Sequence, residues 1–158
     1  MTEIQIGSSA PQFEMPDDRG DIITLSSYEG KYLILFFYPK DNTPGCTTES
    51  KDFSALKEKF SELGAHILGV SRDSVKKHQN FIAKQDLSIQ LGADLTGEMT
   101  EAYGVWVEKK MYGKTYMGIQ RATFLIGPGG DVINIWPKVK VKGHAEEVLQ
   151  TLKNHLTE

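Results

Sequence analysis

The sequence contains very little cysteine, no long apolar run and no excess of positive charge. Its 158 residues include one cysteine, Cys46, so the chain cannot form an intrachain disulfide or supply a thiolate cluster for zinc. The longest apolar stretch, Tyr32 to Tyr38, has seven residues, whereas a membrane span needs about 20. The first residues are neither basic nor apolar enough for an export signal. We therefore expect a cytoplasmic protein that does not enter a membrane.

The charge balance argues against a role in nucleic-acid binding. The 18 Lys and Arg residues are outnumbered by 21 Asp and Glu, which gives a formal net charge of −3, whereas nucleic-acid-binding domains are usually basic. Apolar residues make up 39% of the chain and charged residues 25%, which is ordinary for a folded protein. No repeat or Pro/Ser-rich linker interrupts the sequence, so we expect residues 1–158 to form one domain.

The hydrophobic pattern predicts strands that alternate with helices. Residues 32–38 are apolar on both faces, as in a central strand, and residues 66–71 are typical of a second buried strand. Between them, apolar residues recur at helical spacing, which predicts an amphipathic helix that begins near Pro44. The remaining predicted elements are a hairpin over 11–25, a helix capped by Asp73 or Ser74, a weak strand over 88–93, a short helix over 96–103, a hairpin over 122–136 around Gly-Pro-Gly-Gly, and a final helix with an apolar stripe from Ala145 to Leu156.

This order of elements determines the predicted fold class. Alternating strands and helices followed by an antiparallel pair and a last helix predict a mixed central sheet with helices on both faces. The sequence therefore predicts an α/β protein of the thioredoxin-like fold, with an additional N-terminal β-hairpin.

The surroundings of Cys46 are those of a site rather than of a core stripe. The predicted strand ends at Tyr38, a turn-prone loop follows, and Thr43 can cap a helix that has Pro44 at its first position. Cys46 then lies in the first helical turn, where unpaired amides and the helix dipole favour the thiolate. A lone cysteine is also commonly a small buried hydrophobe, so these arguments leave both a reactive and a structural thiol open.

A family resemblance favours the reactive thiol. The pattern Pro39-x-x-x-Thr43-x-x-Cys46 resembles the active-site signature of the peroxiredoxins, which are thiol peroxidases of thioredoxin-like fold. The longer run from Tyr38 to Glu49 is similar to the Q-type subfamily, also called bacterioferritin comigratory proteins. Three further blocks resemble that subfamily in the same order, so the resemblance covers essentially the whole chain: Tyr103–Trp106, Gly113–Ile119 and Arg121–Ile126.

The resemblance implies roles for four residues. Cys46 would be the peroxidatic cysteine, which attacks the terminal oxygen of a hydroperoxide. Thr43 would place its hydroxyl between sulfur and peroxide, Pro39 would shield the pocket, and Arg121 would bind both sulfur and peroxide. Without the motif, Thr43 could be only a helix N-cap, and we expect it to cap the helix in addition to any catalytic role. Pro39 could simply terminate a strand, and Arg121 could be a surface or ion-paired residue. No cofactor is implied, and the four histidines show no metal-ligand spacing.

Thiol ionisation alone is too small an effect to explain such catalysis. A thiol with an ordinary pKa of ~8.5 is roughly 3% ionised at pH 7, so complete ionisation gains only about 30-fold. Enzymes commonly accelerate reactions by ~10⁶ or more, so most of the effect must come from Thr43, Arg121 and backbone amides that align and polarise the peroxide. Glu49 lies on the same helical face as Cys46, and we expect it to pair with Arg121 and orient it.

The sequence departs from the Q-type pattern because it lacks a resolving cysteine. Many members carry one five residues after the peroxidatic cysteine, where this chain has Lys51, and others carry one in the next helix, where residues 74–86 have none. The Cys46 sulfenic acid would then be reduced by an external thiol such as thioredoxin or glutaredoxin/glutathione. Either the protein is a natural one-cysteine peroxidase or its cysteines have been replaced. We favour the natural version because Lys is an unusual replacement.

Two other functions would use the same thiol. A redox-sensing or chaperone-like binding protein would relay oxidation from Cys46 to a partner instead of turning over with a generic thiol. A cysteine hydrolase has little support, because the sequence shows no Cys–His signature. The Q-type resemblance further suggests a monomer.

Overall fold

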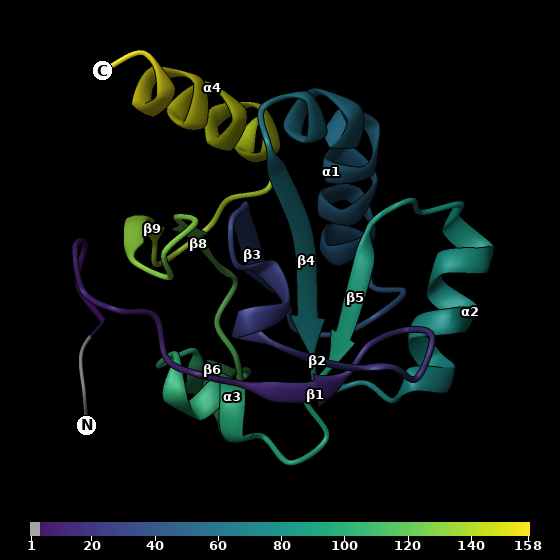
Figure 1. Ribbon diagram of the computed structural model, residues 1–158. Helices are drawn as coiled ribbons and strands as arrows, with labels where there is room; N and C mark the ends of the chain where they lie inside the picture. The colour runs from purple at the N-terminus through teal and green to yellow at the C-terminus, as the bar shows by residue number, and fades with distance from the viewer. Residues whose placement is uncertain (1–3) are drawn as a thin grey trace.

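A five-stranded mixed sheet forms the centre of the computed structural model, which describes residues 4–158 (Figure 1). Its strands are β3 (Tyr32–Phe37), β4 (Ala65–Ser71), β5 (Gln90–Ala93), β8 (Ala122–Ile126) and β9 (Val132–Trp136). They lie in the order β5-β4-β3-β8-β9, with β3, β4 and β5 parallel and β8 antiparallel to both of its neighbours. The run that the sequence predicts to be buried on both faces is therefore the central strand.

Helices cover both faces of this sheet, as the sequence predicts. They are α1 (Pro44–Glu62), α2 (Val75–Gln85), α3 (Glu98–Ala102) and α4 (His144–Leu156). Figure 1 shows α1 and α4 on one side of the sheet, α3 on the other, and α2 beside β5. Alternate residues of β3 follow this division: Ile34 and Phe36 pack toward α1 and α4, whereas Leu33, Leu35 and Phe37 pack toward α3 and the N-terminal segment.

The predicted N-terminal hairpin is a separate two-stranded sheet. Its strands β1 (Glu14–Pro16) and β2 (Ile22–Thr24) are antiparallel, and a short 3₁₀ helix, Leu25–Tyr28, follows. The Asp17 carboxylate holds the turn, because Oδ1 accepts from the backbone N–H groups of Arg19 and Asp21 at 2.9 and 3.0 Å.

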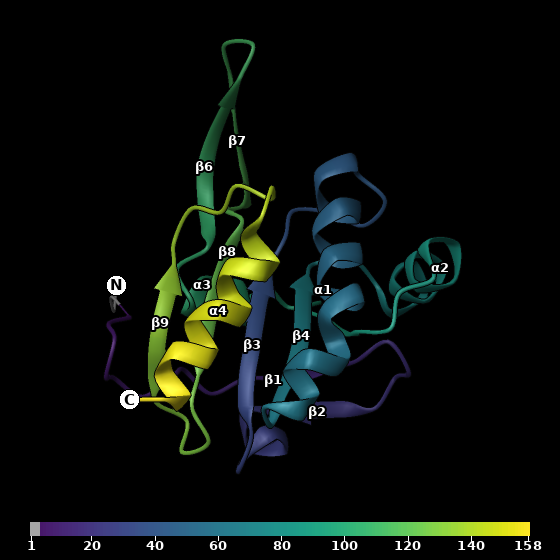
Figure 2. The ribbon, with the colours of Figure 1, turned by 90° about the horizontal axis from the view of Figure 1, so that it is seen from above.

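The structure contains one further hairpin that the sequence pattern does not predict. Strands β6 (Trp106–Met111) and β7 (Lys114–Ile119) pair antiparallel and project away from the body of the molecule (Figure 2). The turn uses Tyr112 and Gly113, both with positive φ (52° and 77°), as a two-residue hairpin turn of this type requires. Most of its side chains are exposed on both faces, so the sequence lacks the alternation that marks a half-buried strand.

The longest helix, α1, packs one face on the sheet and leaves the other in solvent. Its 19 residues bury Phe53 and Phe60 while Lys51 and other charged residues stay exposed. No helix in the described residues is both long enough and apolar enough to cross a membrane.

Candidate active site

Cys46 lies at the carboxyl end of the central strand. β3 ends at Phe37, and α1 begins at Pro44, which is the helix start that the sequence predicts. The N–H of Thr47 is bonded to the carbonyl of Thr43 at 2.9 Å, so Cys46 lies within the first turn. The Cys46 side chain is buried, with only 1% of its surface exposed.

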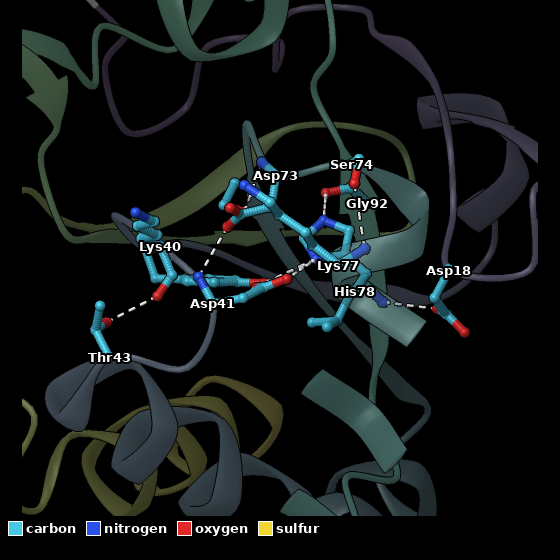
Figure 3. Close-up of polar contacts among 12 residues, drawn as sticks. Asp18, Lys40, Asp41, Thr43, Asp73, Ser74, Lys77, His78 and Gly92 are labelled. Carbon is cyan, nitrogen blue, oxygen red and sulfur yellow. Dashed lines mark hydrogen bonds and ion pairs between the residues drawn. The ribbon is translucent and has the colours of Figure 1, made fainter. Parts of the chain in front are cut away.

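Thr43 is the N-cap residue by position, but its side chain does not cap the helix. Its backbone is extended, with φ −92° and ψ 153°, and its hydroxyl donates instead to the carbonyl oxygen of Lys40 at 2.8 Å (Figure 3). The expectation that the Thr43 side chain acts as a cap is therefore wrong. The hydroxyl turns back into the loop, and the amides of the first turn remain available to another acceptor.

Arg121 joins Cys46 to Glu49. It directly precedes β8, whose first residue pairs with the last residue of β3, so the sheet carries Arg121 to the start of α1. Its Nη2 donates to Cys46 Sγ at 3.4 Å, and its Nη1 donates to Glu49 Oε1 at 2.7 Å. A Cβ atom at Gly45 would lie 3.0 Å from Arg121 Nη2, so the guanidinium crosses the helix start where no side chain intervenes.

Burial and neighbouring charges shift the pKa values of the ionisable side chains around Cys46. Burial raises the pKa of Glu49 to about 7, although Arg121 opposes the shift, and Glu49 Oε2 has no hydrogen-bond partner among residues 4–158. Burial also disfavours the charge of Arg121, but Glu49 and Cys46 outweigh this effect and raise its pKa. The pKa of Lys109 on β6 is lowered, mainly by burial and then by Arg121, while Cys46 opposes the shift. The charge of Lys109 therefore interacts with those of Arg121 and Cys46, which the sequence does not indicate.

The remaining sequence-predicted residues lie around the same loop. Pro39 is partly buried between β3 and α1, and Lys51 is exposed on α1. Pro39, Thr43, Cys46 and Arg121 are thus brought to one end of the sheet. No group of three or more potential ligands suited to a metal ion occurs in the described part of the chain.

A second polar cluster behind the loop is missing from the sequence prediction. It contains Asp41, the phenol of Tyr38, and His78 on α2, and all three side chains are buried. His78 lies on the buried inner face of α2. A histidine on an apolar helical face needs a hydrogen-bond partner inside the protein. This requirement is the one feature of the sequence that indicates the cluster. The identity of that partner, 37 residues away, required the structure.

Comparison with known proteins identifies the family. The AhpC/TSA family profile matches residues 6–135. Peroxiredoxin Bcp of Bacillus subtilis is 52% identical over 151 residues, covering 96% of each chain, and Peroxiredoxin Bcp of Xanthomonas campestris is 49% identical over 157 residues, covering 98% of each. The chain belongs to the AhpC/TSA family.

Solved structures agree with this family and with the predicted thioredoxin-like fold. A cysteine-to-serine mutant of Xylella fastidiosa PrxQ superimposes with a TM-score of 0.93 at 42% identity and 99% coverage of both chains. The bacterioferritin comigratory protein of Xanthomonas campestris, described by its alkyl peroxide reduction activity, gives a TM-score of 0.86 at 50% identity, covering 90% of this chain and 91% of that one. The Q-type resemblance is confirmed, and the chain is a thiol-dependent peroxidase of the peroxiredoxin type.

Proposed function

We propose that the chain reduces hydrogen peroxide and organic hydroperoxides, with Cys46 as the attacking group. The observation that carries this assignment is the Arg121 guanidinium, which bonds to both Cys46 Sγ and the buried Glu49. The Cys46 thiolate attacks the terminal peroxide oxygen, so an S–O bond forms while the O–O bond breaks. Cys46 becomes a sulfenic acid, and the departing oxygen leaves as an alkoxide or hydroxide that takes up one proton.

Neighbouring groups stabilise the charge on the departing oxygen. Arg121 has donors beyond its two bonds, and the first-turn amides of α1 lie at the same helix start. The Thr43 hydroxyl donates its hydrogen to the Lys40 carbonyl, so its oxygen can accept a hydrogen bond from the peroxide O–H and orient it. Glu49 holds the guanidinium in position, and the partly buried Pro39 shields the site from water. The alkyl peroxide reduction described for the Xanthomonas relative supports organic hydroperoxides as substrates.

The sulfenic acid is reduced by a thiol from another molecule. The sequence holds one cysteine, so no second thiol of the same chain can attack it. An external thiol forms a mixed disulfide with Cys46 and releases water, and a second thiol then frees Cys46. We propose thioredoxin or glutaredoxin/glutathione as the reductant and, because such reductants operate in reducing compartments, a cytoplasmic protein. We also propose that it acts as a monomer of one domain, tested by its sedimentation and by cooperative unfolding.

The peroxidase assignment is tested by stopped-flow mixing of the reduced protein with stoichiometric hydrogen peroxide. We expect rapid loss of the single thiol, and Cys46→Ser to abolish turnover. Thioredoxin, glutaredoxin with glutathione, and dithiothreitol are then compared as reductants. Peroxide consumption no faster than that of free cysteine would contradict the assignment. A stable mixed disulfide with one protein and no turnover would favour the redox-relay alternative.

A further inference from the structure

A buried polar cluster ties the loop between β3 and α1 to the elements behind it (Figure 3). Asp41, in the middle of this loop, accepts a hydrogen bond from the Tyr38 hydroxyl at 2.6 Å through Oδ1, and its Oδ2 lies 2.7 Å from His78 Nδ1. Its backbone N–H donates to Asp73 Oδ2 at 2.8 Å. One loop residue is therefore bonded to the end of β3, to α2 and to the segment after β4.

Asp41 and His78 share a proton and leave no polar side-chain atom unpaired. His78 is fully buried, and its Nε2 lies 2.9 Å from the Gly92 carbonyl oxygen, which can only accept, so Nε2 carries a hydrogen. One further proton lies between Nδ1 and Asp41 Oδ2, whether the imidazole or the carboxyl group holds it. In both cases the net charge of the two side chains together is zero. Removing one partner would leave the other buried and uncompensated, so the bonded arrangement is strongly preferred.

The position of Asp41 determines the position of the Thr43 hydroxyl. Lys40, whose carbonyl accepts the Thr43 hydroxyl, directly precedes Asp41 in the chain. Asn42, which follows Asp41, has a left-handed backbone with φ 61°, so the loop turns tightly between the two residues. With the loop and the first turn of α1 in this arrangement, Cys46 is only 1% exposed. An external thiol must contact this sulfur to reduce it, so the loop and the first turn of α1 must open for that step.

We propose that Asp41 and His78 form a positioning pair that holds this loop closed, an inference that rests on the proposed peroxidase function. The closed loop favours oxidation because it aligns Thr43 and the start of α1 with Cys46. It opposes reduction because the sulfur stays buried while the loop and the first turn of α1 keep this arrangement. Weakening the pair slows attack on peroxide and speeds the approach of an external thiol. A residue that only stabilised the fold would not change these two rates in opposite directions.

Two matched pairs of substitutions isolate the bond between these residues. His78→Asn places an amide donor near the position of Nδ1 and keeps the bond to Asp41, whereas His78→Gln places it near Nε2 and loses that bond. Asp41→Asn accepts from Tyr38 and donates to a neutral His78, whereas Asp41→Ala does neither. Tyr28→Phe is the stability control, because it removes a 2.6 Å bond to Gln90 that lies outside this cluster.

Three rates are measured on each variant with folding checked by circular dichroism. They are alkylation of reduced Cys46 by iodoacetamide, its oxidation by hydrogen peroxide in a single turnover, and reduction of the sulfenic acid by dithiothreitol. For His78→Gln and Asp41→Ala we expect oxidation to slow by roughly 10- to 100-fold. We expect alkylation and reduction of these variants to be roughly tenfold faster, because the open loop is more populated. His78→Asn, Asp41→Asn and Tyr28→Phe should stay within about twofold of the unmodified protein, since the pair is kept.

The proposal is overturned if His78→Gln reacts at the unmodified rates, or if His78→Asn changes the rates as much as His78→Gln does. It is also overturned if oxidation and reduction change in the same direction. If Asp41→Ala fails to fold, the comparison of His78→Asn with His78→Gln still tests the proposal. Failure of the peroxidase function is a different result: the unmodified protein would then consume peroxide no faster than free cysteine, while the alkylation rates would still report on the loop.

Discussion

Two hydrogen-bonded acid–base pairs lie beside the start of α1, with equal contact distances and different surroundings. Arg121 Nη1 lies 2.7 Å from Glu49 Oε1, and His78 Nδ1 lies 2.7 Å from Asp41 Oδ2. The Arg121 side chain is 16% exposed and Glu49 Oε2 has no partner in the described residues, whereas both side chains of the second pair are buried and fully bonded.

This difference separates the chemistry of the site from its support. Arg121 keeps donors free next to Cys46, where a peroxide would bind, and such unused capacity is what a developing oxyanion requires. Asp41 and His78 are buried and each of their polar side-chain atoms is already bonded within the protein, so we expect these bonds to fix the backbone that carries them. Variants of the two pairs should therefore fail in different ways.

The largest effect is expected from Arg121. Arg121→Gln should slow oxidation of Cys46 by roughly 100- to 1,000-fold, the usual cost of losing a donor to a developing oxyanion. Arg121→Lys keeps the charge but lacks the planar fork, so it should recover only part of the rate. Rapid-quench measurement of thiol loss gives both values. A wild-type rate in Arg121→Gln would show that the guanidinium takes no part in the reaction.

The second largest effect is the pH dependence of the unfolding free energy that arises from Glu49. Its pKa is raised to about 7 in the folded state, so the protonated form is favoured there. The stability that this provides is complete below the ordinary carboxyl pKa of about 4.5 and is lost as the pH rises through 7. Relative to Glu49→Gln, the unmodified protein should lose about 3 kcal/mol of unfolding free energy over this range.

Urea denaturation of both proteins between pH 4 and 8, in steps of about one unit, measures this difference. The comparison removes the contributions of all other titrating groups, since these are shared. Parallel stability curves for the two proteins would mean that Glu49 titrates normally and is not held by burial.

The smallest effect is expected from Tyr38. Tyr38→Phe removes one of the bonds to Asp41 and leaves the Asp41–His78 contact in place. It should cost about 1 kcal/mol of unfolding free energy and change the rate of Cys46 oxidation by less than His78→Gln does. Denaturation and single-turnover oxidation test this order. A larger kinetic effect in Tyr38→Phe would make the phenol, rather than His78, the principal support of the loop.

Local patterns were enough to predict most of the fold and part of the site. The apolar run at 32–38 indicates the central strand, Pro44 marks the helix start, and the family motif predicts which side chains gather at Cys46. The pairing of Glu49 with Arg121 is predicted from the position of Glu49 on the helical face of Cys46, and the structure confirms it. The catalytic roles of these residues stay predictions.

The remaining features depend on contacts between distant segments or on missing periodicity. The β6–β7 hairpin lies in solvent on both faces, so no apolar alternation marks it. The Asp41–His78 bond joins a loop to a helix 37 residues later, and only the folded chain brings them together. The direction of the Thr43 hydroxyl depends on the turn at Asn42, which residue preferences alone do not determine.

The peroxidatic role of Cys46 is tested most directly by its single-turnover oxidation with stoichiometric hydrogen peroxide, followed by rapid quenching and mass spectrometry of the intact protein. We predict that one oxygen atom is added at Cys46 far faster than free cysteine reacts, and that an external thiol then restores the original mass. Oxidation at the rate of free cysteine, or peroxide turnover that survives in Cys46→Ser, would contradict it.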